Sequence, residues 1–249
     1  MNTIDTAKLW NSIKLVRLND KQLSVQSGAP KTNPGRFIDS ISLLVSNKDA
    51  AFEDFLRIYK ESMSVREQKT PAQISAMLGR HDYQTLLLKR NDLTVGFSII
   101  FMSPKESFCL LEYMAVDATY RNSGLGRQLF LCSVNHIIPK IGVVPVLLEV
   151  DSDREPSADQ PIRKRRQQFY RRLNCLRIDK LAYILPLPGE GAPPEMDLMI
   201  YFPKNVQAVS KIRLQHWLQL IYHDVYDCSN DDPRIIQMMK PVADPVGLA

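Results

Sequence analysis

Two glycines separated by one residue, Gly124 and Gly126, follow an apolar run and open a helical pattern. A strand, a glycine-containing turn and a helix N-terminus together form a site for an anion. Small residues let the backbone approach, and the first N–H groups of a helix have no intrahelical partner. Arg121 and Arg127 add positive charge beside the turn. A tight strand–helix connection without a ligand would use the same residues. No Gly-Lys-Ser/Thr follows, so the turn is not a P-loop, nor does it match the dinucleotide motif GxGxxG.

The spacing of the turn fits the pattern R/Q-x-x-G-x-G/A, with Arg121, Gly124 and Gly126 in the three defined positions. With the preceding "LEYMAV", it resembles the cofactor motif of the GNAT superfamily of acyl-CoA N-acyltransferases, and the order of elements over about residues 38–203 is similar. The resemblance implies that backbone amides of residues 121–126 bind the pyrophosphate of acetyl-CoA. It also implies that the pantetheine arm pairs with the preceding strand, whose free backbone groups its amides can satisfy. The implied cofactor-binding residues are Met114, Ala115, Val116, Arg121, Asn122, Ser123, Gly124, Leu125, Gly126 and Arg127.

A second stretch, "RKRRQQFYRRLNC", is similar to the family pattern N-x-x-A-x-x-x-Y-x-x-x-G-F. Tyr170 stands at the tyrosine position, which implies a general acid that protonates the departing CoA thiolate. The alternative is a buried tyrosine that packs with Phe169 beneath a helix. The departures from the pattern are Arg163 for Asn, Arg166 for Ala, Asn174 for Gly and Cys175 for Phe.

Two carboxylates lie in otherwise apolar strands, where an ionised group needs a partner. Glu112 is the candidate general base, although many family members use no protein base. Glu149 is expected to be structural and to form an ion pair with Arg165 or Arg166 on the following helix. On this hypothesis, Glu149→Gln lowers stability more than turnover.

The formal net charge of the 249-residue chain is +5, and much of it comes from the run at 163–172. Those cations surround a helix without interleaved aromatic platforms, which favours a solvated face, partly assisting an anionic ligand, over a nucleic-acid site. An acidic acyl carrier protein, supplying the acyl donor in place of free CoA, is an alternative partner for this helix and Arg127.

Cysteine and histidine usage predicts a reducing cytoplasm and no metal site. The cysteines lie far apart in apolar segments, and they are Cys109, Cys132, Cys175 and Cys228. His81 and His136 are expected at the surface or at helix ends. No apolar stretch is long enough for a transmembrane helix, and the N-terminus lacks signal-peptide features.

The periodicities predict an α/β fold with a mixed, largely antiparallel sheet flanked by helices. Strands are expected at 41–46, 83–90, 93–102, 107–116, 145–150, 182–187 and 195–202, with a hairpin at Asn91-Asp92. Helices are expected at 5–18, 49–63, 70–80, from the glycine turn to about 138, at 162–173 and at 206–227. The expected parts are an N-terminal helix and linker (1–36, the linker at 27–36), a GNAT-like domain (37–203), and a C-terminal helix and tail (204–249).

The resemblance to the GNAT superfamily implies an N-acyltransferase that transfers an acyl group, acetyl by the habit of the family, to a primary amine of a small molecule or peptide. We expect the protein to be cytoplasmic and either monomeric or homodimeric. The loop at 151–161, the connection at 188–194 and the C-terminal helix are expected to border the acceptor. A CoA-binding regulatory domain without turnover is the alternative outside the enzymes.

Overall fold

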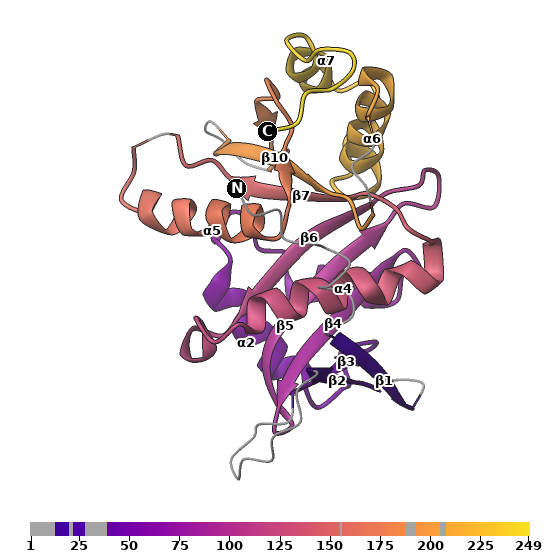
Figure 1. Cartoon of the computed structure of the whole chain (residues 1–249), viewed down its shortest axis with the longest axis vertical. Coiled ribbons are helices and arrows are strands. Elements are labelled where there is room, and N and C mark those ends of the chain that lie inside the picture. The colour runs from indigo at the N-terminus through magenta and orange to yellow at the C-terminus, as the bar shows by residue number, and fades with distance from the viewer. Residues whose placement is uncertain (1–12, 20–21, 28–38, 155, 188–192, 205–207) are drawn as a thin grey trace. The chain divides into compact units, whose positions relative to one another are not determined.

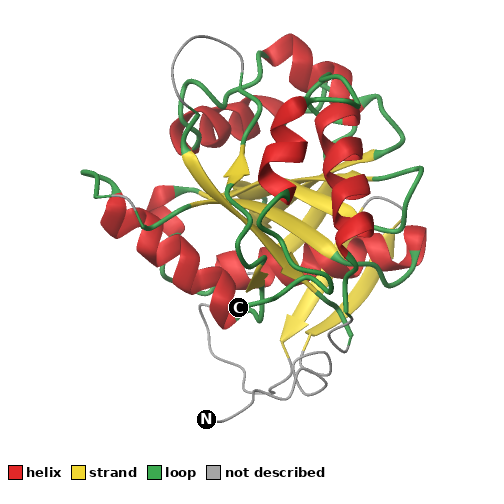
Figure 2. Ribbon diagram, turned by 90° about the horizontal axis from the view of Figure 1, so that it is seen from above, coloured by secondary structure: helices red, strands yellow, loops and turns green. Residues whose placement is uncertain are grey.

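The computed structural model describes residues 13–19, 22–27, 39–154, 156–187, 193–204 and 208–249. As predicted, the fold is a mixed, mostly antiparallel sheet flanked by helices (Figures 1 and 2). The chain divides into two compact units, which we describe separately. The first unit holds residues up to 64, 68–99 and 113–133, and the second holds 65–67, 100–112 and 134–249. Strands β5 and β6 and helix α4 contribute residues to both units.

In the first unit, successive strands along the chain are also neighbours in the sheet. They are β1 (Ile13–Asn19), β2 (Gln22–Ser27), β3 (Asp39–Leu43), β4 (Tyr83–Arg90), β5 (Leu93–Met102) and the end of β6 (Cys109–Val116). The first four pair antiparallel. Asn91 and Asp92 have φ angles of 49° and 65°, so the predicted hairpin turn between β4 and β5 is confirmed.

The predicted helix at residues 5–18 is wrong where the structure describes it. Residues 13–19 form β1, which pairs with β2 from Ile13↔Ser27 to Asn19↔Gln22. A short apolar run does not by itself distinguish a helix from a strand, and the neighbouring strand decides. Residues 1–12 and most of the predicted linker lie outside the described part of the chain.

Helix α2 (Phe52–Ser62) begins three residues later than predicted. The expected cap, Asp49, instead accepts a hydrogen bond from the N–H of Ala51 at 2.9 Å, in the turn before the helix. The buried face of α2 packs on β5, where the rings of Phe55 and Phe97 meet edge to face at 4.9 Å.

Helix α3 (Pro71–Leu78) has the predicted ends. Thr70 and Gln73 form a reciprocal capping box at its start, and Gly79 is its C-cap. The proline at the first helical position loses no intrahelical hydrogen bond, which makes this start easy to predict.

Helix α4 (Leu125–Ile141) continues past Pro139, where the sequence predicted that it stops. Pro139 has no N–H to donate to the carbonyl of Asn135, but the helix continues through it for two further residues. The helix ends instead at Gly142, which has a φ of 80° and donates its N–H to the carbonyl of Ile138 at 2.8 Å.

In the second unit, the start of β6 pairs in parallel with β7 (Val146–Asp151) over three residues, from Cys109↔Val146 to Leu111↔Leu148. Strand β10 (Glu195–Tyr201) pairs antiparallel with the whole of β7, from Met196↔Asp151 to Tyr201↔Val146. Beyond β10 lie the two-residue strands β8 (Leu176–Arg177) and β9 (Tyr183–Ile184). The sequence did not predict β8.

The helices of the second unit are α5 (Gln160–Arg172), α6 (Lys211–Asp224) and α7 (Pro233–Met239). Helices α6 and α7 contact each other (Figure 1). The sequence did not predict α7, although Asp232 caps it and Pro233 opens it, because seven residues are too few to show a helical period.

Candidate active site

The glycine turn lies between β6 and α4 in the first unit. Asn122 and Gly124 have φ angles of 62° and 84°, and the carbonyl of Gly124 accepts from the N–H of Gln128 at 3.1 Å. A Cβ at Gly124 would meet nothing within 4 Å, so the backbone conformation, and not the space, favours glycine. The open space above this glycine is where a ligand could approach the backbone.

Side chains around the turn fix it to the strand. Ser123 donates its hydroxyl to the carbonyl of Tyr120 at 2.5 Å, and Arg121 donates from Nε to the carbonyl of Val116 at 2.9 Å. Asp117 accepts from the N–H of Thr119 at 2.9 Å in the short 3-10 helix η1 (Ala118–Tyr120). The turn that precedes α4 is therefore shaped before any ligand binds.

Most of the residues of the turn that are expected to bind the cofactor are exposed. Arg121, Asn122, Ser123, Gly124 and Arg127 are exposed, Gly126 is half-buried and Leu125 is buried, which anchors the first turn of α4. The N–H groups of residues 125–127 belong to this first turn and have no intrahelical acceptor. They carry the positive end of the helix dipole, which suits an anion.

The other predicted cofactor residues lie at the end of β6, where β5 approaches very closely. A Cβ at Gly96 would lie 2.9 Å from the carbonyl oxygen of Ala115 and 3.4 Å from Cγ2 of Val116. Met114 and Val116 are half-buried and Ala115 is buried. The register with β7 covers only residues 109–111, whereas β6 extends to Val116.

Tyr170 lies in the second unit, on the buried face of α5, and is 8% exposed. Its ring meets that of Phe169 edge to face at 5.0 Å, as the alternative interpretation expects. Burial raises the pKa of the Tyr170 phenol above its ordinary value, so the hydroxyl stays protonated near neutral pH. A protonated phenol is the form that an acid needs.

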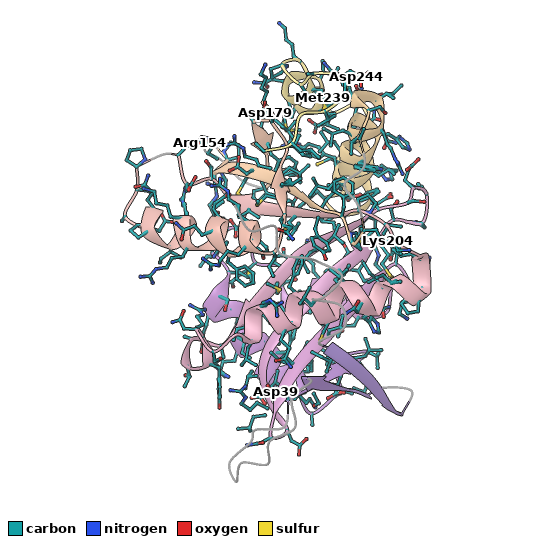
Figure 3. All side chains as sticks on the ribbon, in the orientation of Figure 1. Asp39, Arg154, Asp179, Lys204, Met239 and Asp244 are labelled. Carbon is teal, nitrogen blue, oxygen red and sulfur yellow. The ribbon has the colours of Figure 1, made fainter. Side chains whose placement is uncertain are left out.

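A buried polar network joins α5 to β7 and β10. Asp197 is 1% exposed and accepts from Arg154 at 2.6 Å and from Gln167 at 2.9 Å. Gln167 also donates to the carbonyl of Asp151 at 2.9 Å. Arg154 is labelled in Figure 3. Because Gln167 and Tyr170 both lie on the buried side of α5, this network fixes the helix that carries the tyrosine.

The two candidate carboxylates also belong to the second unit. Glu112 is 9% exposed on β6. Glu149 is half-buried on β7, and its carboxylate accepts hydrogen bonds from the hydroxyls of Tyr183 and Tyr226. The predicted ion pair with Arg165 or Arg166 is wrong, because Arg166 pairs with Asp151. Glu149 and Asp151 both lie on β7. Asp151 is at the end of the strand nearer to α5, and it forms the ion pair with Arg166.

The remaining cations of α5 fit the expected solvated face. Arg163 pairs with Asp159 at 2.9 Å, one helical turn away. Lys164, Arg165, Arg171 and Arg172 are exposed. His136 is half-buried on α4, rather than at the surface or at the end of a helix.

Within the described residues, no group of three or more His, Cys, Asp or Glu side chains is placed to hold a metal ion. In the same part of the chain, no helix has the length and apolar character needed to cross a bilayer.

A strand leads through a left-handed glycine turn into a helix within a mixed sheet, which is the arrangement that the resemblance to GNAT acetyltransferases implies. Residues 50–173 match the model of the acetyltransferase (GNAT) family. The chain belongs to the GNAT superfamily. No protein of curated function matches it in sequence.

Solved structures share the fold. A protein from Bacteroides thetaiotaomicron, assigned to the GNAT family, is similar with a TM-score of 0.59 and 21% identity, over 75% of this chain and 97% of that one. The ribosomal-protein-S18-alanine N-acetyltransferase of Escherichia coli is similar with a TM-score of 0.50 and 16% identity, over 68% and 97%. Ard1 from Thermoplasma volcanium is similar with a TM-score of 0.50 and 18% identity, over 67% of this chain and 99% of that one.

Proposed function

We propose that this protein is an N-acetyltransferase that transfers the acetyl group of acetyl-CoA to a primary amine by direct attack. The observation that carries the proposal is the exposed, preformed turn from Arg121 to Gly124, which opens α4 directly after β6. The acceptor amine belongs to a small molecule or a peptide. The name of the structurally similar E. coli enzyme specifies an alanine of a ribosomal protein, which supports including peptides.

In this proposal, the pyrophosphate lies on the amides of residues 121–127 and the pantetheine arm pairs with Met114–Val116. The arm runs back along β6 from the turn, in the direction of Glu112 on the same strand. The neutral amine attacks the carbonyl carbon, a C–N bond forms and the C–S bond breaks. Tyr170 donates a proton to the thiolate, while Glu112 or water takes the proton from nitrogen.

The cofactor site is tested by changing the charge of the turn with little change of shape. Asp and Asn both tolerate a positive φ, and they differ in charge rather than size. Acetyl-CoA should raise the melting temperature of the parent protein, because it binds only the folded state. Gly124→Asp should abolish this shift by placing a carboxylate at the phosphate position, whereas Gly124→Asn should retain part of it.

Thermal unfolding with and without acetyl-CoA, followed for all three proteins, measures these shifts. If Gly124→Asp responds to acetyl-CoA as the parent does, the assigned cofactor site is wrong. Release of free CoA thiol with a panel of primary amines then tests transfer. Binding without transfer to any amine would favour the non-catalytic alternative.

A further inference from the structure

Glu149 occupies a defined position at the end of the paired part of β7. The parallel register of the second unit ends at Leu111↔Leu148, so Glu112 and Glu149 are the next residues on the two strands. Residues at equivalent positions of parallel strands face the same side of a sheet. Glu149 is thus the first residue of β7 after the paired segment, as Glu112, the candidate base, is on β6.

Two tyrosines from distant parts of the chain hold this carboxylate. Tyr183 of β9 donates to Oε1, and Tyr226, which follows α6, donates to Oε2. Tyr183 is 2% exposed, whereas Tyr226 and Glu149 are half-buried and reachable from solvent. One phenol on each oxygen fixes the plane of the carboxylate.

The two phenols orient the negative charge of Glu149 without neutralising it. Burial, and then the charge of Glu149, raise the pKa of Tyr183 well above its ordinary value, so this phenol donates as a neutral group. An ionised carboxylate accepts about four hydrogen bonds. A bound cation with N–H donors can thus share the carboxylate with both phenols.

Tyr222 belongs to the same aromatic cluster as Tyr183. The two rings meet edge to face at 6.5 Å. The guanidinium of Arg234 lies 5.2 Å from the ring centre of Tyr222, so this ring already has a cation on its face. The attraction for a further cation therefore comes from the carboxylate of Glu149.

We propose that Glu149, oriented by Tyr183 and Tyr226, binds a positively charged group of the acceptor that does not itself react. This inference rests on the proposed function and names its substrate class, an amine with a second cationic group. The bound group is distinct from the nucleophile, because a carboxylate stabilises the protonated form of an amine and would oppose its attack on the thioester. Tyr226 lies outside residues 50–173, so a segment beyond the family match contributes to acceptor choice.

The experiment compares 1,4-diaminobutane with 1-aminobutane, which differ in the second amine. We expect the parent to have a kcat/KM for the diamine about 10- to 100-fold higher, mainly through KM, as for a hydrogen bond to a charged group. Glu149→Gln should bring this ratio near one. Tyr226→Phe and Tyr183→Phe should each reduce it several-fold.

Tyr222→Phe is the matched control. Tyr222 is fully buried in the same cluster, but its hydroxyl donates to the carbonyl of Ile184. Its loss should lower the melting temperature and leave the diamine preference unchanged. A parent ratio near one, or an unchanged ratio in Glu149→Gln and Tyr226→Phe, overturns the inference.

A binding measurement separates this inference from the proposed function. Titration calorimetry with 1,4-diaminobutane, without acetyl-CoA, should give heat of binding for the parent and at least tenfold weaker binding for Glu149→Gln. If the diamine binds in this way but no amine is acetylated, the proposed function fails and the inferred site stands. If acetylation occurs but diamine binding is the same in both proteins, the inferred site fails alone.

Discussion

Tyr170 is a buried phenol, and its burial favours the protonated form. The ordinary pKa of a phenol, about 10, already lies well above neutral pH, and burial raises the pKa of Tyr170 further, so the oxygen keeps its proton. Tyr170→Phe removes only the hydroxyl and keeps the ring against Phe169. We expect turnover to fall by about 10²-fold or more, the usual scale for one positioned acid, with acetyl-CoA affinity nearly unchanged.

Steady-state kinetics on any accepted amine measures this effect. Tyr201→Phe is a suitable control, because Tyr201 is also buried in the second unit and burial raises its pKa to about 12. Its loss should leave turnover close to that of the parent. A Tyr170→Phe enzyme within about twofold of the parent would remove Tyr170 from the mechanism.

The hydrogen-bond partners of Glu149 could not be predicted from the sequence. A carboxylate in an apolar strand predicts a partner, and that much is correct. The partner itself is Tyr226, 77 residues away, together with Tyr183, 34 residues away. No local pattern connects these positions, whereas the arginines expected to pair were simply near in sequence.

At the scale of elements, the contact between β5 and β6 at Gly96 depends on the absence of a side chain. A Cβ there would lie 2.9 Å from the carbonyl oxygen of Ala115, a backbone atom that cannot rotate away. We expect Gly96→Ala to lower the free energy of unfolding by about 1–3 kcal/mol, the usual cost of overpacking. Denaturant unfolding measures it.

Gly79→Ala provides the comparison for that change. Gly79 has a φ of −83°, and an added Cβ would come no closer than 3.6 Å to the carbonyl of Ala76. This substitution should be neutral or slightly stabilising, because it lowers the entropy of the unfolded chain. Equal changes in stability for the two variants would mean that β5 and β6 can move apart to accept a Cβ at position 96 at little cost in free energy.

Elements with their own capping or turn chemistry were predictable, and those decided by a neighbour were not. Thr70-Pro71 at the start of α3 and Asn91-Asp92 in the hairpin fix their local backbone directly. The glycine turn before α4 belongs to the same class. Strand β1 is decided by its pairing with β2, a contact that periodicity does not contain. The end of α4 is set by Gly142, a local capping signal, and the prediction failed there because it gave Pro139 more weight.

At the scale of the chain, the second unit is completed by residues beyond the family match at 50–173. Strand β10 pairs along all of β7, and the last residues pair with the segment after α5. Ala249 and Arg177 exchange two hydrogen bonds of 2.8 and 2.9 Å, and the carbonyl of Gly247 accepts from the N–H of Asp179 at 2.9 Å. The part of the chain that carries Tyr170 and Glu149 is therefore built together with the C-terminal residues.

The stability of the whole molecule should depend on pH through His136. Burial, and then the nearby Lys140, lower the pKa of His136 from 6.5 to about 4. The unfolded chain therefore binds more protons than the folded one between these values, so stability is full above about pH 6.5 and is lost as the pH falls toward 4. The loss is about 1–3 kcal/mol, allowing for partial exposure.

His136→Gln should remove this dependence, because glutamine does not titrate. We expect the free energy of unfolding, measured by denaturant at pH 4 to 7, to fall more steeply with acid in the parent than in His136→Gln. The difference between the two curves isolates the histidine, since the carboxylates are common to both proteins. His81→Gln, at an exposed position, should follow the parent. Parallel curves for the parent and His136→Gln would show that the folded protein accepts a proton at His136 as readily as the unfolded chain does.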